Sequence, residues 1–230
     1  MRETFSVRGA PFALALGVAL LAAPAAWAVP VEFRFTGTVE FVEGPVGLVG
    51  GVTVGAGITG SYVVESATPD LNPDPQLGTY FGAATRFDAQ TQGLVLEVES
   101  PQSGQVQVID GAFGPEDQYD VNVTRGSVSV GSVVAPFVSI QLTMESAAPS
   151  QWITSDALPL TGPPDFGAFE NVLAILIQTS FEPGATVLID ATLDSLEAIP
   201  VPEPAASSAL ALAVLAGLAG SRWSRMGAGA

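Results

Sequence analysis

The chain has 230 residues, 48% of them hydrophobic, and it contains no cysteine, histidine or lysine. Their absence excludes disulfides, thiolate metal sites, and the residues that most often serve as general base, metal ligand or amine nucleophile. Between Val29 and Pro200 there are three arginines and 21 acidic residues, so this body carries a net charge near −18 that repels nucleic acid and anionic lipid surfaces.

The first 28 residues are typical of a secretory signal peptide. Two arginines open the segment, residues 13–23 form an apolar run, and Ala26 and Ala28 form a small-x-small signal-peptidase site. A permanent N-terminal anchor is the alternative, but the apolar run is short and is followed by proline. We therefore expect signal peptidase to release a mature chain that begins at Val29.

The body, residues 29–200, shows the two-residue apolar period of half-buried strands. Val31–Thr36 and Thr38–Phe41 alternate in this way, with Gly37 predicted as a β-bulge between them. Further short strands are predicted at Ile58–Val64, Thr79–Phe87, Leu94–Val98, Val106–Ile109, Tyr119–Val123, Ser127–Val134, Phe137–Met144, Val172–Ile177 and Ala185–Leu196. Since no stretch keeps a helical period, about nine to ten short strands predict an all-β, antiparallel β-sandwich or barrel.

The segment from Glu145 to Glu170 is rich in Pro, Ser, Gly and Asp and is predicted as a long loop. It contains Trp152, Phe166 and Phe169. Such aromatic rings either stack on sugar rings or pin the loop over the open end of the β domain, and the sequence leaves both possibilities open.

Two loops place oxygen ligands at near-alternate positions, as hard cations favour. The candidate calcium ligands are Asp70, Asn72, Asp74, Glu116, Asp117 and Asp120. Ordinary Asx turns and solvated loop residues are the competing interpretation.

Catalysis would have to rely on carboxylates and tyrosines, and no motif singles out a pair. We therefore expect no enzyme, no catalytic residue and no cofactor other than calcium.

The last thirty residues have a separate organisation. A rigid motif, Val201-Pro202-Glu203-Pro204, is followed by the uncharged apolar run 205–220 and by a basic end, 221–230. The 16 residues of the run would form a transmembrane helix about 24 Å long. Arg222 and Arg225 would stop it on the cytoplasmic side, which leaves the body on the exported side.

This tail resembles the PEP-CTERM sorting signal of Gram-negative bacteria that produce exopolysaccharide. The matching residues are Pro202, Glu203 and Pro204, the apolar run, and the basic end. The resemblance implies that an exosortase, a membrane-embedded transpeptidase-like enzyme, recognises the motif and removes the tail. The apolar run is short and alanine-rich, and five residues follow the last arginine, which departs from the usual pattern.

The body is also similar to a β-rich domain that recurs in PEP-CTERM proteins, a likeness that implies no activity. The shared segments are Phe33–Val39, Gly60–Tyr62, Thr68–Asp70 and Gly78–Tyr80.

These observations predict an exported structural or adhesive protein of the cell surface or extracellular matrix, sorted by an exosortase after an inner-membrane intermediate. Its expected partners are signal peptidase, the exosortase, the membrane through the C-terminal helix, and exopolysaccharide, with no nucleic acid. Two alternatives remain: a secreted module that binds polysaccharide or calcium, and a periplasmic domain that is simply anchored in the inner membrane.

Overall fold

The computed structural model describes residues 30–45, 47, 50–99, 101–111, 116–130, 133–146, 152–163, 166–178 and 185–200. The described residues form ten strands: β1 Pro30–Glu43, β2 Gly57–Glu65, β3 Leu77–Phe81, β4 Ala84–Thr91, β5 Leu94–Glu99, β6 Ser103–Asp110, β7 Asp117–Val130, β8 Val133–Ser146, β9 Glu170–Gln178 and β10 Thr186–Pro200. A 3₁₀ turn, η2, spans Phe166–Ala168. The expected all-β fold is confirmed. The predicted signal peptide, sorting motif and transmembrane helix lie outside the described residues.

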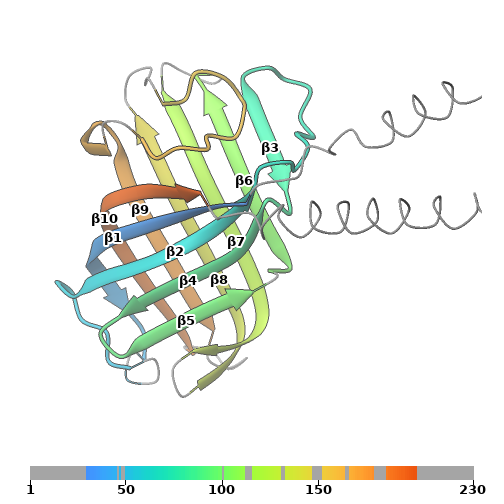
Figure 1. The fold of residues 1–230 in the computed structure, drawn as a ribbon. Coiled ribbons are helices and arrows are strands. Elements are labelled where there is room, and N and C mark those ends of the chain that lie inside the picture. The colour runs from blue at the N-terminus through green and yellow to red at the C-terminus, as the bar shows by residue number, and fades with distance from the viewer. Residues whose placement is uncertain are drawn as a thin grey trace, which may run out of the picture.

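All ten strands belong to one antiparallel sheet with the order β3-β6-β7-β5-β4-β2-β1-β10-β9-β8. A further pairing joins β7 to β8 along the whole length of both strands, so the sheet curls into a partial ring around one core (Figure 1). On its other edge β7 meets β5 at one register pair, Leu96↔Val130. The sequence did not distinguish a β-sandwich from a β-barrel. The described strands form a single curled sheet.

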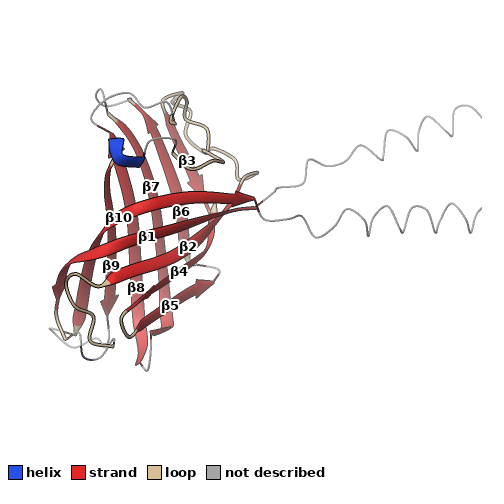
Figure 2. Cartoon of the chain, turned by 60° about the vertical axis from the view of Figure 1, so that its left-hand side comes forward, coloured by secondary structure: helices blue, strands red, loops and turns tan. Residues whose placement is uncertain are grey.

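A bend in one long hairpin explains why the sheet divides at β7. β3 and β4 follow one another along one side of this hairpin, and β5 and β6 follow one another along the other. At the bend Gly82 has a φ of 80° and donates its N–H to the Gly104 carbonyl oxygen at 2.6 Å. Below the bend β4 and β5 stay in the ring, while β3 and β6 leave it as a flap beside β7 (Figure 2).

Two of the predicted strands are wrong because of turns that the apolar pattern does not reveal. Thr79–Phe87 is not one strand, since the left-handed backbone at Gly82 separates β3 from β4. Ser127–Val134 is divided between the end of β7 and the start of β8. The other predicted strands lie within or largely within observed ones.

The irregularity predicted at Gly37 is present, but the extra residue lies on the partner strand. The β1–β10 register shifts at this point so that Asp194 of β10 has no counterpart on β1. Because the shift changes the phase of the alternation, Leu193 and Leu196 both face the core. A Cβ at Gly37 would lie 2.5 Å from the Thr192 carbonyl oxygen, so the close approach of the two strands requires glycine here.

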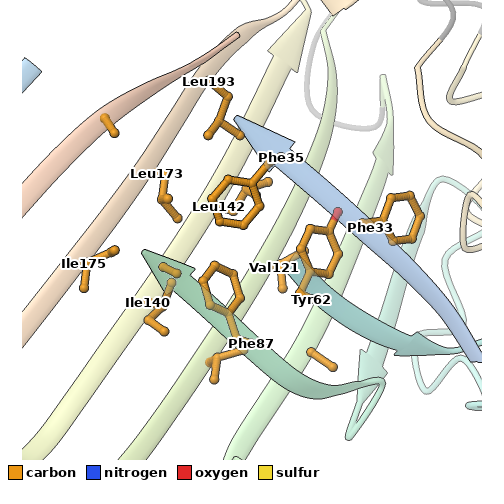
Figure 3. Close-up of a cluster of buried hydrophobic side chains, with 14 of the residues drawn as sticks. Phe33, Phe35, Tyr62, Phe87, Val121, Ile140, Leu142, Leu173, Ile175 and Leu193 are labelled. Atoms are coloured by element: carbon orange, nitrogen blue, oxygen red, sulfur yellow. The ribbon is translucent and has the colours of Figure 1, made fainter. Parts of the chain in front are cut away.

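Aromatic rings from neighbouring strands fill the middle of the ring (Figure 3). Phe33 and Tyr62 stack with their centroids 5.0 Å apart, and Tyr62 stacks in turn on Phe87 at 6.1 Å. Across the interior, the Tyr62 hydroxyl donates a hydrogen bond of 3.3 Å to the Tyr119 hydroxyl. Both hydroxyls are buried, and burial raises the pKa of each tyrosine. The β1–β2–β4 wall and β7 are therefore tied together through the centre of the ring.

The bend provides a test of the fold. A Cβ at Gly104 would collide with the Ala84 carbonyl oxygen, so Gly104→Ala should lower the free energy of unfolding by about 2 kcal/mol or more. Urea denaturation measures this change. Gly57→Ala is the matched control, because a Cβ at Gly57 meets nothing within 4 Å. Equal stability of the two variants would contradict the described packing at the bend.

Candidate functional site

The first predicted calcium cluster forms a series of Asx turns in the loop before β3. Asp70 Oδ1 accepts the Asn72 N–H at 2.8 Å, and Asn72 Oδ1 accepts the Asp74 N–H at 3.0 Å. Asp74 Oδ1 continues the series by accepting the Gln76 N–H at 3.0 Å. These oxygens are engaged with the backbone of their own loop, which favours the turn interpretation of the cluster.

Asp70 also covers the edge of the sheet, a role that sequence reasoning missed. β3 ends the strand order, and unpaired backbone groups on such an edge invite pairing with another chain. The Thr79 N–H donates to Asp70 Oδ1 at 2.8 Å, and the Thr79 carbonyl oxygen accepts the Leu71 N–H at 3.0 Å. The loop thus occupies both outward-facing groups of Thr79. A carboxylate nine residues from its partner leaves no local signal for this contact in the sequence.

The second predicted cluster does not converge on one point. Asp117 and Asp120 are both buried on β7, but two residues lie between them, so their side chains point to opposite faces of the sheet. β3 and β6 lie between this cluster and the Asp70 loop. Within the described ranges, no group of three or more acidic side chains is placed to hold a metal ion.

Four acidic residues do gather on the outer face of β7, β8 and β9, and we call them the acidic patch: Glu116, Asp120, Glu145 and Glu170. Glu145 lies directly opposite Glu170 in the β8–β9 register. A hydrogen bond with the Glu116 carboxyl raises the pKa of Glu145, and the nearby charges of Glu170 and Asp120 act in the same direction. Glu145 therefore binds a proton more readily than an isolated carboxylate does.

Asp120 is the buried member of the acidic patch, with 5% of its surface exposed. Its Oδ2 accepts a hydrogen bond of 2.7 Å from Gln118 Nε2, whereas its Oδ1 is buried without a hydrogen-bond partner among the described residues. Burial raises the pKa of Asp120, and hydrogen bonds from Thr143 and Gln118 oppose this only in part. The charged form of Asp120 is thus disfavoured in the folded protein.

This shift predicts a pH dependence of stability. A carboxyl whose folded pKa is raised stabilises the fold below its unfolded value, about 3.9, and loses that contribution as the pH rises through the folded pKa. Asp120→Asn should therefore raise the melting temperature at pH 7 and give little gain near pH 4. Glu97→Gln, on the exposed face of β5, is the control. A gain of the same size at both pH values would show that the Asp120 charge is not responsible.

The long loop folds over the end of the ring, and its aromatic rings point inward. Trp152 and Phe169 are buried, and the Trp152 ring packs on Tyr119 and Phe169 at centroid distances of 5.1 and 5.6 Å. Trp152 Nε1 donates to the Thr161 carbonyl oxygen at 2.6 Å, and the Tyr80 hydroxyl donates to the Asp156 carbonyl oxygen at 2.7 Å. The buried Trp152 and Phe169 rings therefore pin the loop and are not presented to a sugar. Phe166, at η2, is partly buried against the same core.

Beneath this loop lies a small buried polar cluster on three adjacent strands: Asp117, Ser146 and Asn171. Asp117 pairs with Ser146 in the β7–β8 register. Asn171 Nδ2 donates to the Phe169 carbonyl oxygen at 3.0 Å, which fixes the amide. Asn171 Oδ1 is buried without a hydrogen-bond partner among the described residues, and an acceptor in this position is normally satisfied by an internal water molecule.

The start of the first strand and the end of the last strand lie side by side. Val31 near the start of β1 pairs with Pro200 at the end of β10. The residues predicted to be recognised during export, namely Ala26, Ala28, Val201, Pro202, Glu203, Pro204, Arg222 and Arg225, lie outside the described residues. No helix within the described part of the chain is long and apolar enough to cross a membrane.

Comparison with known proteins gives no match to a family model, to a curated protein or to a solved structure.

Proposed function

We propose that this chain is an exported structural or adhesive protein of the cell surface or extracellular matrix, sorted through its C-terminal tail by an exosortase. The tail supplies the principal support. A Pro-Glu-Pro motif, an apolar run and two arginines follow one another without interruption, and a signal-peptide pattern opens the chain. Signal peptidase and the exosortase would act on the two ends.

The boundaries of the folded domain also support the proposal. β1 begins at Pro30, two residues after the predicted signal-peptidase site, and β10 ends at Pro200, directly before the motif. Cleavage at both sites would therefore leave every described strand and core residue in place. Val31 and Pro200, the described residues close to the two predicted processing sites, are register partners at one end of the domain.

The prolines suit this position. Proline lacks an N–H and cannot continue a strand ladder, so Pro200, Pro202 and Pro204 limit the extension of β10 into the motif. The residue before a proline favours an extended backbone, which would present the Glu203 carboxylate beside the folded domain. An extended acidic residue between two prolines is a compact recognition element for a membrane-bound enzyme.

The competing hypotheses differ in what they require of the body. A polysaccharide-binding module would have to use surfaces other than the buried Trp152 and Phe169 rings. A calcium-binding module would need the acidic patch to rearrange around the ion. A simple membrane anchor would need only the apolar run and the arginines.

Substitution of the motif separates sorting from anchoring. Glu203→Gln should leave the protein in the inner membrane with its tail attached, because the carboxylate that the enzyme recognises is lost. Fractionation of the producing bacterium and immunoblotting measure this. Glu197→Gln, on the exposed face of β10 six residues earlier, should be sorted normally. Normal release of the Glu203→Gln protein would contradict sorting through this motif.

A further inference from the structure

The buried polar cluster beneath the long loop continues onto a fourth strand. Asp110, the last residue of β6, is the register partner of Asp117, and Asp117 is in turn the register partner of Ser146. Opposite residues of an antiparallel pair carry their side chains on the same face, with Cβ atoms about 4.5–5.5 Å apart. Asp117 and Ser146 are buried, so Asp110, which is partly buried, lies on the inner face beside them. Two carboxyl groups are thus neighbours on the inner face of the sheet.

Oxygen atoms that can only accept hydrogen bonds gather at this point. Asn171 Oδ1 is buried and accepts no hydrogen bond among the described residues, and its Nδ2 is already bonded to the Phe169 carbonyl oxygen. Asp117 Oδ1 is likewise buried and accepts no hydrogen bond there, although Asp117 has other interactions. Asp117 is 1% exposed and Asn171 is 8% exposed. Ser146, on the strand between theirs, contributes a hydroxyl.

No positively charged side chain of this protein can neutralise the cluster. The chain has no lysine or histidine, and its body has three arginines, Arg34, Arg86 and Arg125. Arg34 and Arg86 form ion pairs at exposed positions on β1 and β4. Arg125 lies eight residues from Asp117 along β7, a distance of about 26 Å. Since buried carboxylates in proteins are normally paired or bound to a metal ion, the missing positive charge must come from solution.

The oxygen atoms present are those that a hard cation prefers. A water molecule would satisfy Asn171 Oδ1, but it would leave two carboxylates of like charge on opposite positions of neighbouring strands, which is unfavourable. Ca²⁺ takes about six to eight oxygen ligands from carboxylates, amide carbonyls and water, in a flexible geometry. Its two positive charges would balance the carboxylates of Asp110 and Asp117.

We infer that this cluster holds a calcium ion on the inner face of the sheet, beneath the long loop. Asp110 and Asp117 supply the charged ligands, and Ser146 and Asn171 supply neutral oxygens. The ion would join β6 of the flap to β7, β8 and β9 of the ring. Such an ion is part of the fold, unlike one bound at the acidic patch of the outer face. The inference concerns the folded body and does not depend on sorting of the tail.

Thermal unfolding of the full chain in a mild non-ionic detergent tests the site. The melting temperature in about 5 mM CaCl₂ should exceed that in EGTA at equal ionic strength by about 3 °C or more, because the ion binds only the folded protein. MgCl₂ should give a much smaller rise, since Mg²⁺ demands octahedral geometry and loses its water reluctantly. An unchanged melting temperature in CaCl₂ would overturn the inference and leave water as the occupant.

Two substitutions and a matched control locate the ion. Asp117→Asn should abolish the calcium-dependent rise, and Asp110→Asn, at a less buried position, should do the same even if Asp117→Asn fails to fold. In EGTA, Asp110→Asn should be at least as stable as the parent, because one of two neighbouring charges is removed. Glu145→Gln removes the same charge one residue before Ser146 on the opposite face and should keep the full rise.

Terbium luminescence gives a second measurement that does not depend on stability. The Trp152 ring packs on Tyr119 and Phe169, which lie two residues from Asp117 and Asn171, so this indole can sensitise Tb³⁺ bound in the cluster. The emission should be displaced by CaCl₂ in the parent and in Glu145→Gln, and it should be lost in Asp110→Asn. A calcium response that survives Asp110→Asn, or one that Glu145→Gln abolishes, would contradict the assignment, and the latter would place the ion at the acidic patch.

Discussion

The stack of aromatic rings across the interior is the contact on which the rest of the structure depends. Phe33, Tyr62 and Phe87 come from three neighbouring strands, and Tyr119 comes from β7 on the far side of the ring. Aromatic pairs of this kind contribute about 0.5–1.5 kcal/mol each beyond the burial of their surface. Since β5 and β7 share one register pair, these contacts hold the curled sheet closed where its ladder is weakest. They also provide the platform on which Trp152 fixes the long loop.

Local patterns predicted the strands well, because a half-buried sheet imposes a two-residue period on the sequence. They failed where one residue changes the path of the backbone, as at Gly82, since a glycine within an apolar stretch fits a strand and a turn equally well. Closure of the ring through β7 and β8 depends on contacts between distant segments, which leave no local pattern. The sandwich and the barrel could not be separated for the same reason.

Among the candidate ligands, the sequence correctly located Asp70, Asn72 and Asp74 in a loop, but it was wrong for Asp117 and Asp120, which lie on strand β7. It also could not show what these side chains contact. Asp70, Asn72 and Asp74 bond to backbone N–H groups, and Asp70 also covers a sheet edge. The alternation of β7 separates Asp117 from Asp120, although the two are near in sequence. The acidic patch arises from register across three strands, so it becomes visible only once the pairing is known. The acidic side chains therefore have different roles: those of the Asp70 loop order its backbone, whereas those of the acidic patch lie close together on the outer face of the sheet.

The proposed sorting of this protein requires that the tail be removed during export while the folded domain stays intact. Intact mass of the native protein, taken from separated cell fractions of its own host, tests it most directly. The account predicts a species that begins at Val29, ends within residues 201–204 and is found outside the inner membrane. A species that retains Arg222 and Arg225 in the inner membrane would contradict the account and would identify the tail as an anchor.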